Sequence, residues 1–317
     1  MTDSDKIEHF PLEILPEIQA NPGGYRLLER VPFSDYDEES NYPVVLGPEA
    51  PDEKSLIILD TETTGLELDS AQIIELGMVK VKYSIHEARI TRIVSVYDAF
   101  EQPEEPIPEL ITRITGIDNS MVEGRYFDEA RVMKYFQDSP LVVAHNATMD
   151  RGFVEKRFSP LFASMNLRLP WACTVNDVDW HRLFPGIASR KQEYLLNQRG
   201  YFYDAHRAIN DCLALLWLLH TTPGVMVSLL QNARRRNLAL RVGTGGNTWN
   251  HRDAFRDFGY RYVRFRNAWE KICQDQNEVN RELEMLRGQM MIPDAQIQVS
   301  VLDAYTRYRD KLEALGR

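Results

Sequence analysis

The sequence predicts an α/β protein built on a mixed β-sheet with helices on its faces. The apolar run LIILD at residues 56–60 is followed by IIELGMVKVKYS and ITRIVSVYDAF, whose alternation is typical of an antiparallel meander. Two more short apolar segments, LVVAH and residues 171–175, then alternate with segments of helical spacing. A strand meander followed by strand–helix alternation indicates a mixed sheet covered by helices.

The helices are expected in four places. A short one follows the proline-punctuated loop in PEEPIPELITRITGI, and MDRGFVEKRFSPLF has helical spacing directly after the fourth strand. Residues 191–199 and 205–220 give two more, the second with a broad apolar face, and TTPG at 221–224 ends it.

Bulk properties limit the class of protein. The 317 residues, 44% of them apolar, predict more than one folded unit. The N-terminus does not read as a secretory signal, and no apolar stretch is long enough for a membrane span, so a soluble protein is expected. Three cysteines without CxxC spacing favour neither a disulfide framework nor a zinc site, which fits a reducing cytoplasm.

Charge is distributed unevenly along the chain. The net charge of −10 is unusual for a protein that binds nucleic acid, because phosphate binding usually shows as a basic surface. Residues 1–53 hold 13 acidic side chains against 3 basic ones, whereas residues 231–271 hold 10 basic against 3 acidic. Two interpretations stay open: differently solvated surfaces, or a nucleic-acid contact in the basic region.

Composition divides the chain into four segments. Residues 1–54, rich in Pro, Gly and acids, predict an N-terminal arm, and residues 55–222 carry the α/β pattern. Residues 231–273 predict a small α+β module of strand, Gly-rich turn, short helix and two strands. Residues 274–317 predict a helical tail with helices over 275–290 and 295–315, broken at Pro293. The apolar stripes of that tail indicate either a self-packed hairpin or a homodimer contact.

Two carboxylates stand at the end of the first apolar run. In a strand, residues two apart point to the same face, so Asp60 and Glu62 lie side by side. Buried ionised carboxylates need compensation, and Mg²⁺ or Mn²⁺ provides it through oxygen ligands. Gly65 lets the following turn approach a ligand closely. Taken alone, the Asp-x-Glu pattern also fits a cap or a solvated turn.

Two more acidic positions follow later in the chain. Asp150 comes just after the fourth strand, where open sheets build their sites, although an acid there also suits a helix N-terminus. His206 is expected on the loop entering the last helix and Asp211 within that helix. A histidine suits activation of water near neutral pH, but a lone His206 also reads as a surface or capping residue.

The order of these motifs resembles the DEDDh, or DnaQ-like, 3′-5′ exonuclease superfamily. The resemblance rests on DTETTG from Asp60 to Gly65, HNA followed by Asp150, and HRA followed by Asp211; ITGI at residues 114–117 resembles its proofreading-subunit branch. It covers residues 55–222, about half of the chain. Met149 departs from the family, which often has an aromatic residue there; the change affects packing beside the site but removes no catalytic group.

The resemblance implies a ribonuclease H-like fold with a five-stranded mixed sheet and a site for two divalent metal ions, Mg²⁺ or Mn²⁺. Asp60, Glu62, Asp150 and Asp211 would be the ligands, and His206 the general base. Substrate contacts are expected at Thr63, Gly65, Leu66, His145 and Asn146. The implied substrate is a nucleic acid with a free 3′ end, single-stranded DNA being favoured, cleaved to nucleoside 5′-monophosphates.

The basic module offers a second candidate surface. Arg261, Arg264, Arg266 and Trp269 combine charge for phosphates with a flat face for bases, although the aromatics also fit a small core. Three other functions stay open: a 3′-5′ exoribonuclease, a non-catalytic nucleic-acid-binding or polymerase-associated module, and an acidic scaffold. A polymerase partner would be needed for proofreading.

Overall fold

The computed structural model describes residues 11–33, 40–264 and 267–309. Its strands are β1 (Glu29–Arg30), β2 (Val44–Val45), β3 (Glu53–Thr63), β4 (Ile73–Ser84), β5 (Arg89–Phe100), β6 (Val142–Ala144), β7 (Trp171–Cys173), β8 (Tyr201–Phe202), β9 (Asn237–Gly243), β10 (Arg261–Val263), β11 (Ala268–Cys273) and β12 (Ile297–Leu302).

Its α-helices are α1 (Leu15–Ala20), α2 (Glu109–Thr115), α3 (Asn119–Val122), α4 (Glu129–Gln137), α5 (Ala147–Ser164), α6 (Trp180–Leu183), α7 (Gln192–Gln198), α8 (Ala208–Thr221), α9 (Val225–Ala233), α10 (Arg252–Asp257) and α11 (Gln276–Gly288). Short 3-10 turns are η2 (Leu12–Ile14), η3 (Pro22–Gly24), η4 (Gly246–Trp249) and η6 (Asp294–Gln296).

The main sheet has six strands in the order β2-β5-β4-β3-β6-β7. β3, β4 and β5 form the expected antiparallel meander, and β6 and β7 add in parallel to β3. The five expected strands are therefore present, but the strand count was wrong by one. Val44 and Val45, within the segment interpreted as an arm, pair with β5 at the edge of the sheet.

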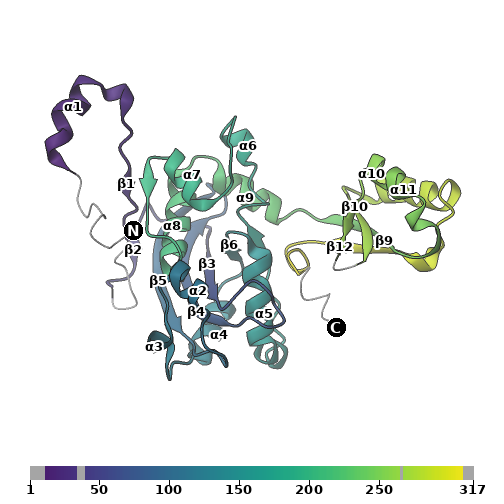
Figure 1. Ribbon diagram of the computed structural model, residues 1–317, viewed down its shortest axis with the longest axis horizontal. Helices are drawn as coiled ribbons and strands as arrows, with labels where there is room; N and C mark the ends of the chain where they lie inside the picture. Colours follow the sequence, from purple (N-terminus) through teal and green to yellow (C-terminus); the bar gives the residue numbers. More distant parts are fainter. Residues whose placement is uncertain (1–10, 34–39, 265–266, 310–317) are drawn as a thin grey trace.

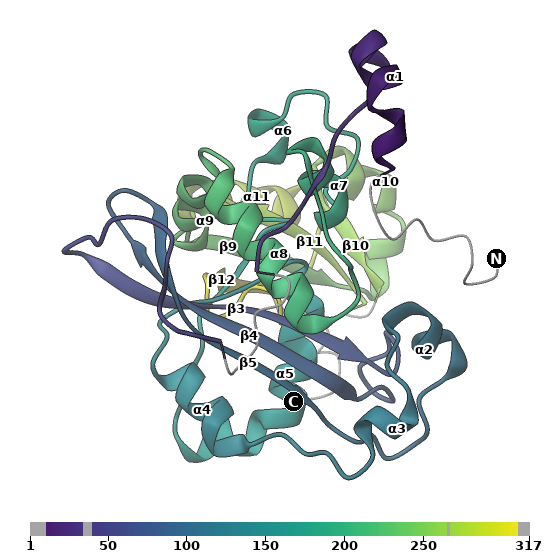
Figure 2. The same cartoon turned by 90° about the vertical axis from the view of Figure 1, so that its left-hand side faces the viewer.

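Helices cover both faces of this sheet (Figure 2). On one face, apolar residues of α7, α8 and α9 pack with Leu56 and Ile58 of β3; on the other, residues of α4 and α5 pack with Ile57 and Leu59. Successive residues of β3 thus alternate between two buried faces, as expected for a central strand. This alternation decides which face each residue of the following motif occupies.

The described part of the arm also docks near the carboxyl-terminal half of this domain. β1 pairs in parallel with β8, with Glu29 opposite Tyr201 and Arg30 opposite Phe202. Val31, which follows, is 2% exposed and belongs to the core on the α8 face. The arm therefore continues the fold.

A second sheet, in the order β10-β11-β9-β12, forms the module that lies to one side of the main sheet (Figure 1). The expected strand, turn, helix and two strands are present over residues 237–273. α11 confirms the first tail helix. The second, expected over 295–315, is wrong for its described part, because Ile297, Val299 and Val301 alternate in β12 and pair with β9.

The chain then returns to the main sheet. The amide of Trp171 in β7 donates to the carbonyl of Ala304 at 2.8 Å, so residues 303–309 cover this edge. Arg151, 1% exposed, donates to the carbonyls of Ala304, Tyr305 and Arg307. This contact ties α5 to the end of the described chain.

Among the described residues, no single helix has the length and apolarity to cross a membrane. α8 and α9 meet that test only as a pair, and the pair is bent by 105°.

Candidate active site

The alternation of β3 splits the first motif between the two faces of the sheet. Asp60 and Glu62 follow Leu56 and Ile58 in register, so they project on the α8 face, whereas Thr61 projects on the α5 face. Asp60 and Glu62 are partly buried, and Thr61 is buried. One strand therefore offers two carboxylates to α8 and a hydroxyl to α5.

A glycine on the next strand brings α8 close to these carboxylates. Gly77 lies opposite Asp60 on β4, and a Cβ built there would be 2.5 Å from the carbonyl carbon of Ala208. Any side chain at residue 77 would therefore push away the first turn of α8. With glycine there, Asp211 reaches the sheet.

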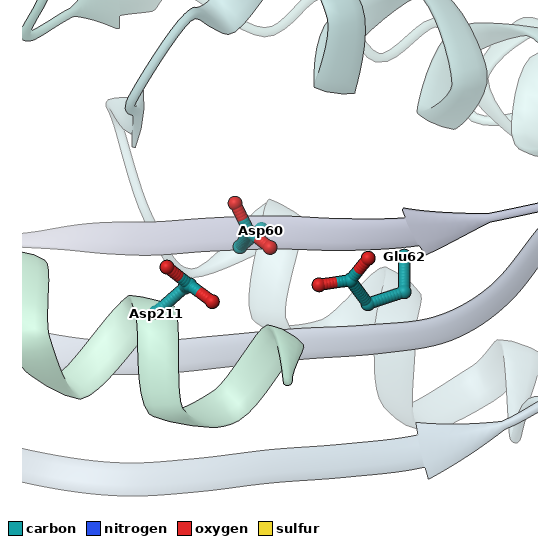
Figure 3. Close-up of side chains that lie close together, drawn as sticks. All are labelled: Asp60, Glu62 and Asp211. Atoms are coloured by element: carbon teal, nitrogen blue, oxygen red, sulfur yellow. The ribbon is translucent and has the colours of Figure 1, made fainter. Parts of the chain in front are cut away.

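Three carboxylates meet at this point (Figure 3). Asp60 and Glu62 from β3 and Asp211 from α8 each offer an oxygen, and these oxygens lie within 4.8 Å of one another. The expected convergence of acids from the first and third motifs is thus present in the structure.

The fourth predicted ligand approaches from the other face. Asp150 lies in the first turn of α5 and is 4% exposed. Its Oδ1 accepts hydrogen bonds from the amide and the hydroxyl of Thr61, at 3.1 and 3.0 Å. Asp150 therefore sits beside Asp60 in the chain's fold but outside the group of three oxygens.

Burial and mutual repulsion raise the pKa values of the acids at this site, so a nearby positive charge would stabilise their ionised forms. Burial, and then the charges of Asp150, Asp211 and Glu62, raises the pKa of Asp60 well above its ordinary value. Burial, followed by the charge of Asp211, raises the pKa of Glu62 to about 8. Burial also raises the pKa of Asp150 to about 7, against the Thr61 hydrogen bonds that lower it.

This donor set fits a hard divalent cation. In the described part of the chain, no salt bridge joins any of the four acids to Lys, Arg or His. Carboxylate oxygens are the ligands that Mg²⁺ and Mn²⁺ prefer, and a cation among them would offset their mutual repulsion. Asp60, Glu62 and Asp211 can hold one, with Asp150 adjacent.

His206 lies on the loop before α8, as the spacing predicted, and its side chain is exposed. Its backbone is in the left-handed region, with φ of 70°, which is uncommon for a residue other than glycine. The His206 amide donates to Asp211 Oδ2 at 2.8 Å. Burial raises the pKa of Asp211, and hydrogen bonds from the Tyr203 hydroxyl and the His206 amide act in the opposite direction.

A fifth acid at the site, which sequence reasoning missed, orients the same loop. Glu75 of β4 is fully buried opposite Glu62. Its carboxylate pairs with the Arg207 guanidinium at 2.9 Å and accepts a hydrogen bond from the Ala208 amide, also at 2.9 Å. Glu75 therefore fixes the N-terminus of α8. Its place directly before Leu76 and Gly77 in an expected strand gave no sign of that contact.

Two polar residues around Asp211 were also missed. The Tyr203 hydroxyl donates to Asp211 Oδ1 at 2.7 Å, and Gln192 Nε2 donates to the Tyr203 oxygen at 3.0 Å. Burial, followed by the charge of Asp211, raises the pKa of Tyr203 far above its usual range, so this hydroxyl stays protonated. Residues from α7 and from the loop after β8 meet here, which no local pattern indicates.

The turn after β3 holds three predicted substrate contacts. Thr63 is buried and its hydroxyl donates to the Gly65 carbonyl at 2.7 Å, which gives it a role within the turn. A Cβ at Gly65 would meet only the Ala71 Cβ at 3.7 Å, so packing within the described chain does not require glycine. Leu66 is 66% exposed. Lys156 anchors this turn through the carbonyls of residues 68, 69 and 71.

The two predicted contacts after β6 differ in exposure. His145 contacts the Thr174 hydroxyl at 2.7 Å and the Arg190 carbonyl at 2.9 Å, so both ring nitrogens are engaged within the chain. Burial lowers the pKa of His145 to about 4. Asn146 is exposed, with φ of 72° at the N-cap of α5. Of the two, only Asn146 offers its side chain to solvent.

The predicted contact residues of the module also differ in exposure. Arg261 and Arg264 are exposed, and Arg266 lies outside the described residues. Trp269 is 6% exposed and stacks on Phe255, with ring centroids 5.1 Å apart. Its expected nucleic-acid contact was wrong, because the ring fills the core of the module.

The model of the exonuclease family RNase T matches residues 57–219, slightly more than half of the chain, and all of the acids described above lie within that match. The chain therefore belongs to the exonuclease family, in its DnaQ-like 3′-5′ class, with the ribonuclease H-like fold.

Named relatives cover parts of this chain and different shares of their own length. DNA polymerase III PolC-type of Caldanaerobacter subterraneus is 29% identical over 65% of this chain but only 14% of its own length. DNA polymerase III subunit epsilon of Aquifex aeolicus is 26% identical over 50% of this chain and 74% of its own.

A solved structure of exonuclease X in complex with 5′ overhanging duplex DNA is 27% identical and covers 56% of this chain and 98% of that one. Its TM-score is 0.41, too low for the two sites to be compared.

Proposed function

We propose that this protein removes nucleotides from the 3′ ends of DNA with the help of two divalent metal ions, Mg²⁺ or Mn²⁺, and releases nucleoside 5′-monophosphates. The observation that carries the proposal is the meeting of Asp60, Glu62 and Asp211 within 4.8 Å, in a chain of the exonuclease family. The names of the relatives, DNA polymerase III PolC-type and subunit epsilon, favour DNA as the substrate.

The four acids are proposed to have different roles in metal binding, according to their position. Asp60 lies between Asp211 on the α8 face and Asp150 on the α5 face, so it suits a shared ligand. Glu62 and Asp211 complete the group on the α8 face, and Asp150 serves the other side of the strand. When bound, the cations would supply positive charge to the scissile phosphate and to the attacking and departing oxygens.

His206 is proposed as the general base. It sits on an exposed loop whose backbone is fixed by Asp211, so its imidazole can accept a proton from water while the carboxylate stays in place. Leu66, Asn146 and the turn at Gly65 are accessible from solvent beside the site and are proposed to contact the terminal nucleotides. Thr63 and His145 are proposed to support that surface through the turn and the loop that they hold.

The basic module is proposed to hold the substrate strand. Arg261 and Arg264 are exposed for phosphates, and Trp249, 72% exposed with the Arg252 guanidinium 5.3 Å from its ring, offers a face for a base. Charge reversal by Arg261→Glu and Arg264→Glu should weaken binding of single-stranded DNA and flatten its dependence on salt, as measured by fluorescence anisotropy. Unchanged binding would remove the module from this role.

A polymerase partner and a cytoplasmic location are further parts of the proposal. The first is supported by the names of the relatives, and the second by three buried cysteines, none of them in a disulfide. Co-purification with a polymerase from the source cells tests the first, and fractionation of those cells tests the second.

The direct test is digestion of 3′-labelled and 5′-labelled single-stranded DNA, duplex DNA and RNA with Mg²⁺ or Mn²⁺. Wild-type protein should release labelled mononucleotides first from the 3′ end. Asp60→Ala and Asp211→Ala should reduce cleavage by about three orders of magnitude with an unchanged circular dichroism spectrum. Glu87→Gln changes an exposed acid in the turn after β4, at the opposite end of the β3–β4 pair from Asp60; it is the control and should cleave normally.

Undiminished cleavage by Asp60→Ala would refute the assignment. Faster cleavage of RNA than of DNA would make the protein an exoribonuclease, and absence of cleavage of every substrate would leave a binding module.

A further inference from the structure

Asp211 is held by donors on both of its oxygens. The Tyr203 hydroxyl donates to Oδ1 at 2.7 Å, and the His206 amide donates to Oδ2 at 2.8 Å. Gln192, which is buried, donates through Nε2 to the Tyr203 oxygen at 3.0 Å and to the Asp211 carbonyl at 2.9 Å. One amide group thus aligns both the tyrosine and the backbone of Asp211.

These hydrogen bonds oppose rotation of the Asp211 carboxylate away from the other two acids. Asp211 faces Asp60 and Glu62, and like charges at this distance repel. An aspartate side chain on the first turn of a helix can rotate toward solvent to relieve that repulsion. The Tyr203 and His206 donors keep its plane fixed, and Gln192 Nε2 also lies 3.4 Å from Oδ1. Among the described residues, Oδ2 accepts only the His206 hydrogen bond, which leaves a lone pair of that oxygen for a cation.

The position of Tyr203 depends on pairing with the N-terminal segment. The Glu29 amide donates to the Gly200 carbonyl at 2.8 Å, and the Val31 amide to the Phe202 carbonyl at 2.9 Å. These bonds frame β8, and Tyr203 is the next residue. Gln192 enters from the first turn of α7. The N-terminal segment therefore holds β8, and Tyr203 and Gln192 contact Asp211 directly.

We propose that Tyr203, aligned by Gln192, is a positioning residue that fixes the Asp211 carboxylate for binding a divalent cation. The proposal rests on the proposed function, because it takes Asp211 as a metal ligand. It adds two residues of this chain whose role is to hold that ligand.

The test uses the full chain with Tyr203→Phe, which removes only the hydroxyl. Mn²⁺ binding to the metal-free protein is measured by calorimetric titration and by electron paramagnetic resonance of free Mn²⁺. Loss of a hydrogen bond that orients a ligand should weaken binding about 10–100-fold. Activity should fall at limiting Mn²⁺ and recover at saturating Mn²⁺, a rescue that a general folding defect would not show.

Two further variants complete the design. Tyr201→Phe, two residues earlier, is the matched control, because its ring packs on Trp217 with centroids 5.6 Å apart, and it should bind Mn²⁺ normally. Gln192→Met removes the aligning amide and should weaken binding severalfold, which keeps the proposal testable if Tyr203→Phe does not fold.

The outcomes separate this inference from the proposed function. Wild-type Mn²⁺ affinity in both Tyr203→Phe and Gln192→Met would overturn the positioning role, while loss of binding in Asp60→Asn would still support the metal site. Normal Mn²⁺ binding in Asp60→Asn would instead overturn the proposed function and this inference with it.

Discussion

Glu75 and Glu62 face each other across β4 and β3, and their surroundings differ in one respect. Glu75 has the Arg207 guanidinium and a helix amide as partners, whereas Glu62 faces Asp60 and Asp211. Like charges opposite each other on neighbouring strands are destabilising unless they are compensated. The chain supplies the Arg207 cation for Glu75, whereas Glu62 is arranged for a cation from solution.

The largest effect on the free energy of unfolding is expected at Glu75, which has the Arg207 guanidinium as its partner. Glu75→Gln removes the charge that Arg207 needs and weakens the cap on α8. Because Arg207 is one-third exposed, the cost should be about 2–3 kcal/mol in the free energy of unfolding, below the range for fully buried pairs. Urea denaturation followed by circular dichroism measures it. A cost below about 0.5 kcal/mol would show that Glu75 does not anchor the helix.

At Glu62, which faces acids and no cation of the chain, a change in stability of the opposite sign is expected. Glu62→Gln removes a repelling charge, so in EDTA at pH 8 it should raise the free energy of unfolding by about 1 kcal/mol. The same variant should lose most of its stabilisation by Mn²⁺, because a ligand is gone. A destabilised Glu62→Gln protein in EDTA would contradict the account of this site.

The dependence of stability on pH gives a second test of the uncompensated charge at Glu62. The folded-state pKa of Glu62 is raised to about 8 from an ordinary 4.5, so the folded state binds its proton more tightly than the unfolded state does. The contribution of Glu62 to stability is therefore lost as pH rises through this window. Asp150, with its pKa raised to about 7, acts in the same direction.

In thermal melts in EDTA, wild-type protein should lose stability between pH 5 and pH 8 more steeply than Glu62→Gln does. Saturating Mn²⁺ should remove the difference in slope at the upper end. Parallel pH profiles for the two proteins would show that Glu62 has no raised pKa in the folded state.

The smallest effect is expected at a charge pair on the surface. Arg30 contacts Asp204 at 2.6 Å beside the His206 loop, but the two side chains are 47% and 73% exposed. Solvent screens such pairs, so Arg30→Ala should change the free energy of unfolding by less than about 1 kcal/mol and leave Mn²⁺ affinity unchanged. A larger loss of affinity would mean that the N-terminal segment acts on the site through charge as well as through backbone pairing.

The sequence predicts the central sheet and the acidic motifs well, for a physical reason. Strands β3 to β7 are apolar runs or alternating segments, and Asp60, Glu62 and Asp211 stand at their ends or at a helix start, so their placement follows from short-range periodicity. Helices α1, α3, α4, α6 and α9 were missed. The four-segment division of the chain stays a prediction.

What the sequence does not predict depends on contacts between distant segments. β1 and β2 are two residues long, and only their partners β8 and β5 make them strands. The apolar spacing after residue 295 fits a helix as well as a strand, and pairing with β9 decides between them. Trp269, Tyr203 and Glu75 have no local signal for burial in a core, for holding Asp211 or for capping α8.

Calorimetric titration of the metal-free protein with Mn²⁺ measures whether the acids around Asp60 bind divalent cations. Wild-type protein should bind two ions per chain, and Asp60→Asn should lose binding. No measurable binding by wild-type protein, or equal binding by Asp60→Asn, would contradict this prediction.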